Sequence, residues 1–148
     1  MSSGRGMKAV VMRIFENLFN EEVSGERERI IDPQVLGRPM GGSGPHETLL
    51  VIESLRRSFP DLRFEVDDMI AEGDQVCALW TMTGTHLGQF LSVAPTGRTI
   101  RVSGVTVFEL PRGRWRSSRG SWDLPHALAQ LGAPVPGMGP GPAPVPSA

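Results

Sequence analysis

Residues 73–98 read GDQVCALWTMTGTHLGQFLSVAPTGR, a run that begins like a strand and ends like a turn. From Gln75 to Thr85 most residues are β-branched, aromatic or apolar, which is typical of a strand. Because alternate residues of a strand share one face, His86 is expected among hydrophobic side chains. That face holds Val76, Ala78, Trp80, Met82 and His86. The segment Ala94–Gly97 predicts a turn into the next strand, since proline fixes φ and glycine suits the fourth turn position.

Two amphipathic helices are predicted before this strand. Apolar residues recur at three- and four-residue spacing from Met7 to Leu18, which predicts a helix that ends near Asn20. The same spacing predicts a second helix between Ser43 and Pro60, with the serine as its cap. Each helix has one apolar stripe, so both are expected to pack on a sheet.

The segment between these helices contains a short predicted helix over Glu26–Ile31. From Val35 to Gly44 glycine and proline are so frequent that a flexible connection without helix or strand is predicted. Arg38 and Met40 in this connection are interpreted as loop surface, with contact to a ligand as the alternative.

Further strands are predicted over residues 62–66, 101–110 and 114–122, the last two joined by a hairpin turn. Asp68, just after the first of them, is expected at the rim of the sheet. A short closing helix is predicted over residues 124–131. Helices followed by an antiparallel sheet indicate an α+β fold, with the sheet curled around the helices.

The chain is predicted to fold as one domain over residues 7–132. Its 148 residues and 39% hydrophobic content suffice for one core with a small cavity. Residues 1–6 are expected to be a disordered leader, and the Pro/Gly-rich residues 133–148 a disordered tail. No apolar run is long enough for a signal peptide or a membrane span, so a soluble, cytoplasmic protein that binds no membrane is predicted.

Composition argues against several kinds of chemistry. Lys8 is the only lysine and lies near the start of the chain, a poor place for a Schiff-base nucleophile. Cys77 is the one cysteine, so no internal disulfide is possible and a buried thiol is expected. The histidines His46, His86 and His126 are too far apart and too poorly partnered to suggest a metal site. With no dinucleotide fingerprint either, an enzyme of this sequence is expected to need no metal and no cofactor.

Three features together resemble a known family. Residues 84–88 read Gly-Thr-His-Leu-Gly, a Pro-Thr-Gly-Arg turn ends at Arg98, and Asp123 lies seven residues before a Gln-Leu-Gly triplet. This arrangement resembles the SnoaL-like polyketide cyclases of the nuclear-transport-factor-two-like superfamily. The resemblance covers roughly residues 15–132. It implies a conical half-barrel of curved antiparallel sheet wrapped around N-terminal helices, a deep pocket between them, and a homodimer.

Three residues are catalytic candidates. On the residues alone Asp123 is best explained as the N-cap of the following helix, whereas the resemblance implies that it is the general acid/base of an intramolecular aldol closure. His86 would protonate or orient a substrate oxygen, with a structural histidine as the alternative. Glu109 would be a partner of Asp123 or His86, although a glutamate paired with an arginine across the hairpin is the preferred interpretation.

Large apolar side chains are expected to line a pocket for a reduced or polycyclic ligand. Plain core packing is the alternative for each of them. The chain contains no tyrosine, so it cannot form the tyrosine-based oxyanion hole of ketosteroid isomerase. The predicted substrate-binding residues are Trp80, Met82, Phe90 and Trp122.

Arginines crowd two adjoining predicted strands, a pattern that is usually a solvated face. Such a face could also dock an acidic carrier protein. Nucleic acid is not expected as a partner, because the formal net charge is −1 and only Trp115 interleaves with the arginines as a stacking residue. These arginines are Arg98, Arg101, Arg112, Arg114, Arg116 and Arg119.

The leading functional hypothesis is a cofactor-independent cyclase of antibiotic or related natural-product biosynthesis, with Asp123 moving a proton and aromatic walls folding a polyketide-like substrate. An epoxide-opening or pericyclic cyclase is the first alternative. A non-catalytic ligand-binding or dimer-adaptor module is the second, because this fold also serves as an interaction surface. A deep pocket with an inward Asp123 would favour the enzyme, and a filled core the adaptor.

Overall fold

The structure is a computed structural model that describes residues 3–38 and 42–134. A five-stranded sheet forms its centre, with strand order β1-β5-β4-β3-β2. The strands are β1 (Ile31–Arg38), β2 (Arg63–Glu72), β3 (Gln75–Thr85), β4 (Thr99–Glu109) and β5 (Trp115–Trp122). The helices are α1 (Gly4–Ile14), the π-helix η1 (Phe15–Asn20), α2 (Glu26–Ile30), α3 (Gly44–Ser58), the 3₁₀ turn η2 (Pro111–Gly113) and α4 (Leu124–Gln130).

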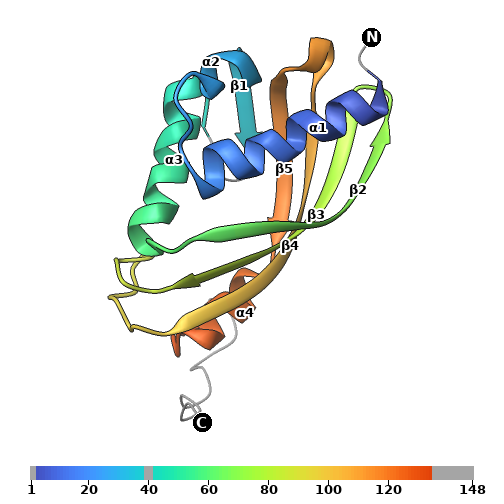
Figure 1. The fold of residues 1–148 in the computed structure, drawn as a ribbon. Coiled ribbons are helices and arrows are strands. Elements are labelled where there is room, and N and C mark those ends of the chain that lie inside the picture. The colour runs from blue at the N-terminus through green and yellow to red at the C-terminus, as the bar shows by residue number, and fades with distance from the viewer. Residues whose placement is uncertain (1–2, 39–41, 135–148) are drawn as a thin grey trace.

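Strands β2 to β5 form an antiparallel sheet, and β1 lies parallel to β5 at one edge. Figure 1 shows β2, β3 and β4 as long twisted ribbons, with α1 crossing the sheet and α3 lying beside it. The sheet curves around these helices and stays open. The predicted α+β fold, with a curved sheet wrapped around N-terminal helices, is therefore confirmed.

Strand β1 is the element that the sequence did not indicate. The prediction of a connection without secondary structure from Val35 to Gly44 is wrong in its first part, because residues 36–38 pair with residues 117–119 of β5. Glycine lowers strand propensity, but an edge strand needs hydrogen bonds on one side only. Met40 lies outside the described residues.

Helix α1 begins earlier than its apolar stripe suggests. The Ser3 side chain caps it by accepting a hydrogen bond from the Gly6 N–H at 3.0 Å, so residues 4–6 of the expected leader are helical. The inner face of α1 buries Met7, Val11 and Ile14. Each such side chain contributes about 1.5–3 kcal/mol of hydrophobic free energy. Most of the expected tail, residues 135–148, lies outside the described part of the chain.

The β3–β4 hairpin is the longest pairing in the sheet. Its register runs without a break from Gln75 opposite Glu109 to Thr85 opposite Thr99. Beyond the last pair the His86 N–H donates to the Arg98 carbonyl at 2.8 Å, which closes the loop containing the predicted turn. The hairpin thus carries the inward-facing residues of both strands along one continuous wall.

Candidate functional site

A cavity of about 120 Å³ lies between the helices η1 and α3 and the inner face of the sheet. Aromatic and aliphatic side chains make up most of its wall, with a few polar groups among them. Small-molecule sites are usually concave and lined mostly by apolar side chains, as this cavity is, and most are larger, about 300–1,000 Å³. The lining residues are Phe15, Phe19, Arg38, Thr48, Val51, Ile52, Leu55, Phe64, Trp80, Met82, Thr106, Phe108, Trp115, Ser118, Gly120, Ser121 and Trp122.

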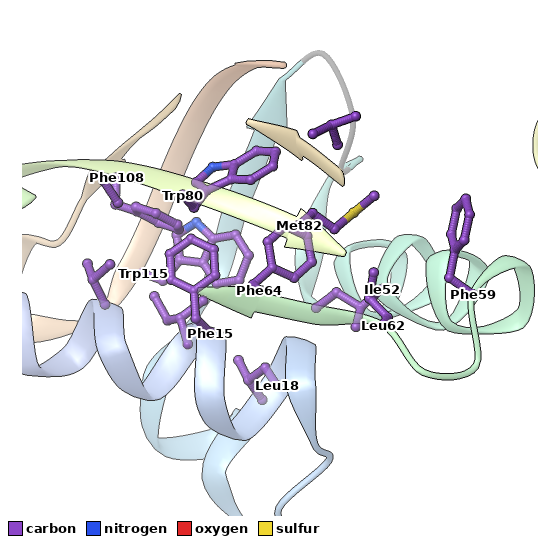
Figure 2. Packing of buried hydrophobic residues seen from close by; sticks show 14 of the residues in the cluster. Phe15, Leu18, Ile52, Phe59, Leu62, Phe64, Trp80, Met82, Phe108 and Trp115 are labelled. Carbon is purple, nitrogen blue, oxygen red and sulfur yellow. The ribbon is translucent and has the colours of Figure 1, made fainter. Parts of the chain in front are cut away.

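The π-helix η1 brings two aromatic rings to this pocket. The ring centroids of Phe15 and Phe19 lie 5.5 Å apart. Phe64 of β2 completes this corner, with its ring centroid 5.6 Å from that of Phe15 and 5.0 Å from that of Phe19. Figure 2 shows Phe15 and Phe64 in the space between helix and strands. A π-helical turn is rare and frequently occurs at a functional site, which fits its position here.

Side chains from other elements hold η1 in place. The Asn20 side chain donates to the Phe64 carbonyl at 2.9 Å and accepts from the Phe64 N–H at 2.6 Å. The Arg56 guanidinium of α3 donates to the carbonyls of Leu18 and Phe19, which the end of a helix leaves unpaired. These bonds join η1 to both walls of the pocket and fix its aromatic rings before any ligand binds.

Trp80 of β3 is one of the aromatic residues that line the pocket. Its indole lies against Gly104 of β4, where a Cβ atom would sit 2.3 Å from Cζ2 of the indole. The indole Nε1–H donates to Oγ1 of Thr106 at 2.9 Å. Phe64 packs edge-to-face on the indole, with ring centroids 5.1 Å apart. Only glycine at position 104 leaves room for the indole in this orientation.

Apart from the indole N–H groups of Trp80, Trp115 and Trp122, the polar side-chain groups on the pocket wall are hydroxyls and one guanidinium. The Thr48 hydroxyl already donates to the Gly44 carbonyl at 2.9 Å. Every aspartate, glutamate and histidine lies within the described ranges, and none of them lines the pocket. The wall therefore offers a ligand hydrogen bonds and one positive charge. The polar lining residues are Arg38, Thr48, Thr106, Ser118 and Ser121.

Asp123 lies one residue beyond the pocket wall, directly after Trp122. Its Oδ1 accepts a hydrogen bond from the His126 N–H at 3.0 Å, so the side chain is the N-cap of α4. The side chain is 56% exposed. The structure thus shows Asp123 as the cap of α4, and its role as a general acid/base stays a prediction.

His86 is completely buried beside the pocket and does not line it. The Thr96 N–H donates to Nδ1 at 3.2 Å, and the ring packs against Phe59 with centroids 5.6 Å apart. Burial lowers the pKa of the imidazole below its ordinary value of 6.5, and the carbonyls of Gly88 and Val93 partly offset this effect. The structure therefore places His86 in the packed base of the 86–98 loop, where burial disfavours the charged form of its imidazole.

Glu109 lies at the opposite end of the β3–β4 hairpin from His86. Its carboxylate accepts a hydrogen bond from the Gln75 side chain at 3.2 Å, and it does not reach the pocket. The three catalytic candidates each have separate partners and share no hydrogen bond with one another in the described part of the chain.

Three of the four predicted substrate-binding residues, Trp80, Met82 and Trp122, line the cavity. Phe90 lies behind it and supports the wall, with its ring centroid 6.0 Å from that of Trp122. Sequence reasoning missed Thr106 and assigned Trp115 to the arginine-rich face. Trp115 instead lines the cavity, and it lies where the β1–β5 register is irregular, a feature without a sequence signal.

No helix in residues 3–38 and 42–134 combines the length and the apolar character needed to span a membrane. Within the same ranges, no three His, Cys, Asp or Glu side chains gather where they could hold a metal ion.

The fold matches proteins of known structure. TsrD from Streptomyces laurentii has a TM-score of 0.82 and 21% identity, over 90% of this chain and 100% of TsrD. IdmH from Streptomyces antibioticus has a TM-score of 0.74 and 25% identity, over 86% of this chain and 99% of IdmH. A SnoaL-like polyketide cyclase from Agrobacterium tumefaciens has a TM-score of 0.74 and 19% identity, over 89% of this chain and 100% of that protein.

The comparison with curated proteins found no match. The sequence model of the SnoaL-like polyketide cyclases, in contrast, matches residues 9–131. That match runs from the first turns of α1 to the end of α4 and includes every strand of the sheet. Because it covers most of the chain, the protein belongs to the SnoaL-like polyketide cyclase family.

Proposed function

We propose that the protein is a cofactor-independent cyclase that acts on a polyketide-type intermediate of natural-product biosynthesis. The aromatic pocket is the observation that carries this proposal, because the rings around Trp80 form a wall suited to a flat, apolar ligand. Family membership supports a polyketide-type substrate. An adaptor module is the weaker alternative, since a cavity of about 120 Å³ remains between the helices and the sheet.

Shape-directed ring closure, of the pericyclic kind, is the mechanism that this geometry supports best. Walls that hold a flexible substrate in one folded conformer bring its reacting carbons together, and such positioning contributes up to about 7–11 kcal/mol in well-oriented intramolecular reactions. The hydrogen bonds that fix η1 and Trp80 provide walls of this kind. Asp123 and His86 are both engaged outside the cavity.

Proton transfer through Asp123, for an aldol closure or an epoxide opening, is the second candidate mechanism. Its exposed carboxylate follows Trp122, so a substrate that extends past Trp122 would meet it at the rim of the pocket. The imidazole of His126 is also there, with Nδ1 3.8 Å from Oδ2 of Asp123. His86 and Glu109 are proposed to support the pocket and the hairpin in this scheme.

We further propose that an acidic carrier protein delivers the substrate. Arg38 lines the pocket and is exposed, and it pairs in register with the exposed Arg119 of β5. An exposed arginine on the wall of an apolar pocket, with a second exposed arginine paired to it in the sheet, suits an acidic partner that carries an apolar chain.

Metabolite profiling of a deletion strain tests the proposed activity. Loss of the gene is expected to remove one cyclic metabolite and to accumulate an open precursor, of equal mass for an isomerisation or one water heavier for an aldol condensation. The purified protein should convert that precursor when no cofactor is added. An unchanged metabolite profile, or conversion that requires an added cofactor, would contradict the proposal.

A homodimer that forms through the outer face of the sheet is also proposed. Leu79 and Val105 are cross-strand neighbours on this face and are 42% and 37% exposed, and Ile70 nearby is 61% exposed. A second copy would bury this apolar patch. We expect Leu79→Glu to convert a dimer of twice 16.1 kDa into a monomer in light scattering, because burying an unpaired carboxylate is costly.

The matched control is Leu87→Glu, which places the same charge on a loop residue that is 58% exposed. It should leave the dimer intact. A wild-type protein that is monomeric at micromolar concentration, or a Leu79→Glu variant that stays dimeric, would show that this face is not the interface.

A further inference from the structure

Thr106 stands out among the inward-facing residues of β4. Its neighbours on that face, Ile100, Val102 and Phe108, are buried hydrophobic residues, and position 104 is the glycine under Trp80. A hydroxyl on an apolar wall costs free energy unless it has hydrogen-bond partners. Thr106 lines the pocket, so one of its partners can be a ligand.

The hydrogen bond from Trp80 determines whether the Thr106 hydroxyl acts as a donor or as an acceptor towards a ligand. An indole N–H can only donate, so Oγ1 of Thr106 accepts from Nε1 of Trp80. A hydroxyl that accepts in this way keeps its own proton free to donate, and no acceptor for that proton is found among the described residues. A chain of two hydrogen bonds also polarises the second donor. Thr106 is thus prepared to donate to an oxygen atom inside the pocket.

The residue opposite Thr106 leaves this hydroxyl uncovered. Gly120 of β5 is the register partner of Thr106 and also lines the pocket. A Cβ atom at Gly120 would lie 3.1 Å from Oγ1 of Thr106, in the space next to the hydroxyl. Glycines at 104 and 120 therefore serve complementary purposes: the first admits the indole, and the second keeps one side of the hydroxyl open.

We propose that the Thr106 hydroxyl donates a hydrogen bond to a carbonyl or enolate oxygen of the ligand, with the indole of Trp80 as the positioning group. The inference rests on the proposed function in taking this pocket as the substrate site. It adds that the substrate has a hydrogen-bond acceptor oxygen, and that this oxygen lies next to Thr106 and Trp80 in the bound state. For a ring closure, this bond would fix the register of the folded substrate and draw electron density towards that oxygen.

Two small ligands that differ in one oxygen test this inference without knowledge of the substrate. Indane and 1-indanone have the same fused rings, and only 1-indanone has a carbonyl. The affinity of each is measured by NMR titration of the full chain. Thr106→Val is expected to weaken 1-indanone binding about threefold to tenfold, the range for one neutral hydrogen bond, and to leave indane binding within twofold. Thr106→Ser keeps the hydroxyl and should keep the wild-type affinity for 1-indanone.

A second measurement does not depend on Thr106→Val, in case that variant does not fold. The chain has three tryptophans, and Trp80→Phe identifies which of the three indole N–H signals belongs to Trp80. Saturation with 1-indanone should shift the Trp80 signal downfield, because the Thr106 hydroxyl becomes a better acceptor once it donates. Indane should produce a smaller shift.

The inference would be overturned if Thr106→Val lowered the affinity for both ligands equally, or if both ligands shifted the Trp80 indole signal equally. Thr106 would then only determine the shape of the pocket. Failure of the wild type to bind either ligand would overturn the inference as well. The cyclase proposal is tested separately by turnover of the accumulated precursor. Selective binding of 1-indanone by a protein without that turnover would therefore uphold the Thr106 inference while the proposed function fails.

Discussion

Gly104→Val is expected to lower the free energy of unfolding by about 2–4 kcal/mol and to displace the Trp80 indole. A Cβ atom at 104 would lie 2.3 Å from Cζ2 of Trp80, far inside van der Waals contact. Overpacking of this kind costs about 1–3 kcal/mol, and separation of Trp80 from Thr106 adds the loss of one hydrogen bond, about 1 kcal/mol. Urea unfolding measures the first effect, and a shifted Trp80 indole N–H signal in NMR reports the second.

Ser103→Val is the matched control, because Ser103 is the preceding residue of the same strand and is exposed. We expect it to change stability by no more than about 0.5 kcal/mol. If Gly104→Val unfolds at the same urea concentration as Ser103→Val, and its Trp80 signal is unchanged, the close packing of Trp80 on Gly104 does not support the pocket.

Much of the fold was predictable because its elements have strong local patterns. The β3 segment alternates, the helices α1 and α3 have apolar stripes, and turn residues separate β3 from β4 and β4 from β5. Strand β1 has none of these signals. Its pairing with β5 spans more than 80 residues of sequence and is parallel, so only the folded sheet shows that residues 31–38 belong to it.

The pocket was predictable in part. Trp80 and Met82 were found because they alternate along a strand that the sequence identifies with little ambiguity. Phe90 was placed in the wall by its aromatic character, but the 86–98 loop turns its ring behind Trp122. Thr106 was missed because a threonine in a strand is ordinary, and its importance depends on the indole of a residue 26 positions away.

The catalytic candidates show that a sequence motif does not determine what surrounds its residues in the folded protein. His86 belongs to the Gly-Thr-His-Leu-Gly segment, yet its ring is packed between Phe59 and Phe90. Asp123 occupies the position that the family resemblance assigns to the general acid/base, and it also satisfies the cap of α4. The sequence is consistent with Asp123 as a helix cap and with Asp123 as a general acid/base. Only an experiment that separates capping from proton transfer distinguishes the two roles.

Asp123→Asn is suited to that separation, because asparagine caps a helix about as well as aspartate and carries no titratable proton. Stability should change by at most about 1 kcal/mol. If ring closure is directed by pocket shape, turnover should stay within about tenfold of the wild type. Loss of a general acid/base costs about 100-fold or more, so the two mechanisms predict different results.

Turnover of the accumulated precursor by Val51→Trp tests the central claim, that the aromatic pocket folds the substrate. Val51 lines the cavity from α3, so an indole there fills the space that the substrate needs. The neighbouring Leu50 is 44% exposed and does not line the cavity, which makes Leu50→Trp the control. We predict that Val51→Trp folds and loses about 100-fold or more in turnover, whereas Leu50→Trp retains it. Wild-type turnover by a folded Val51→Trp variant would contradict this account.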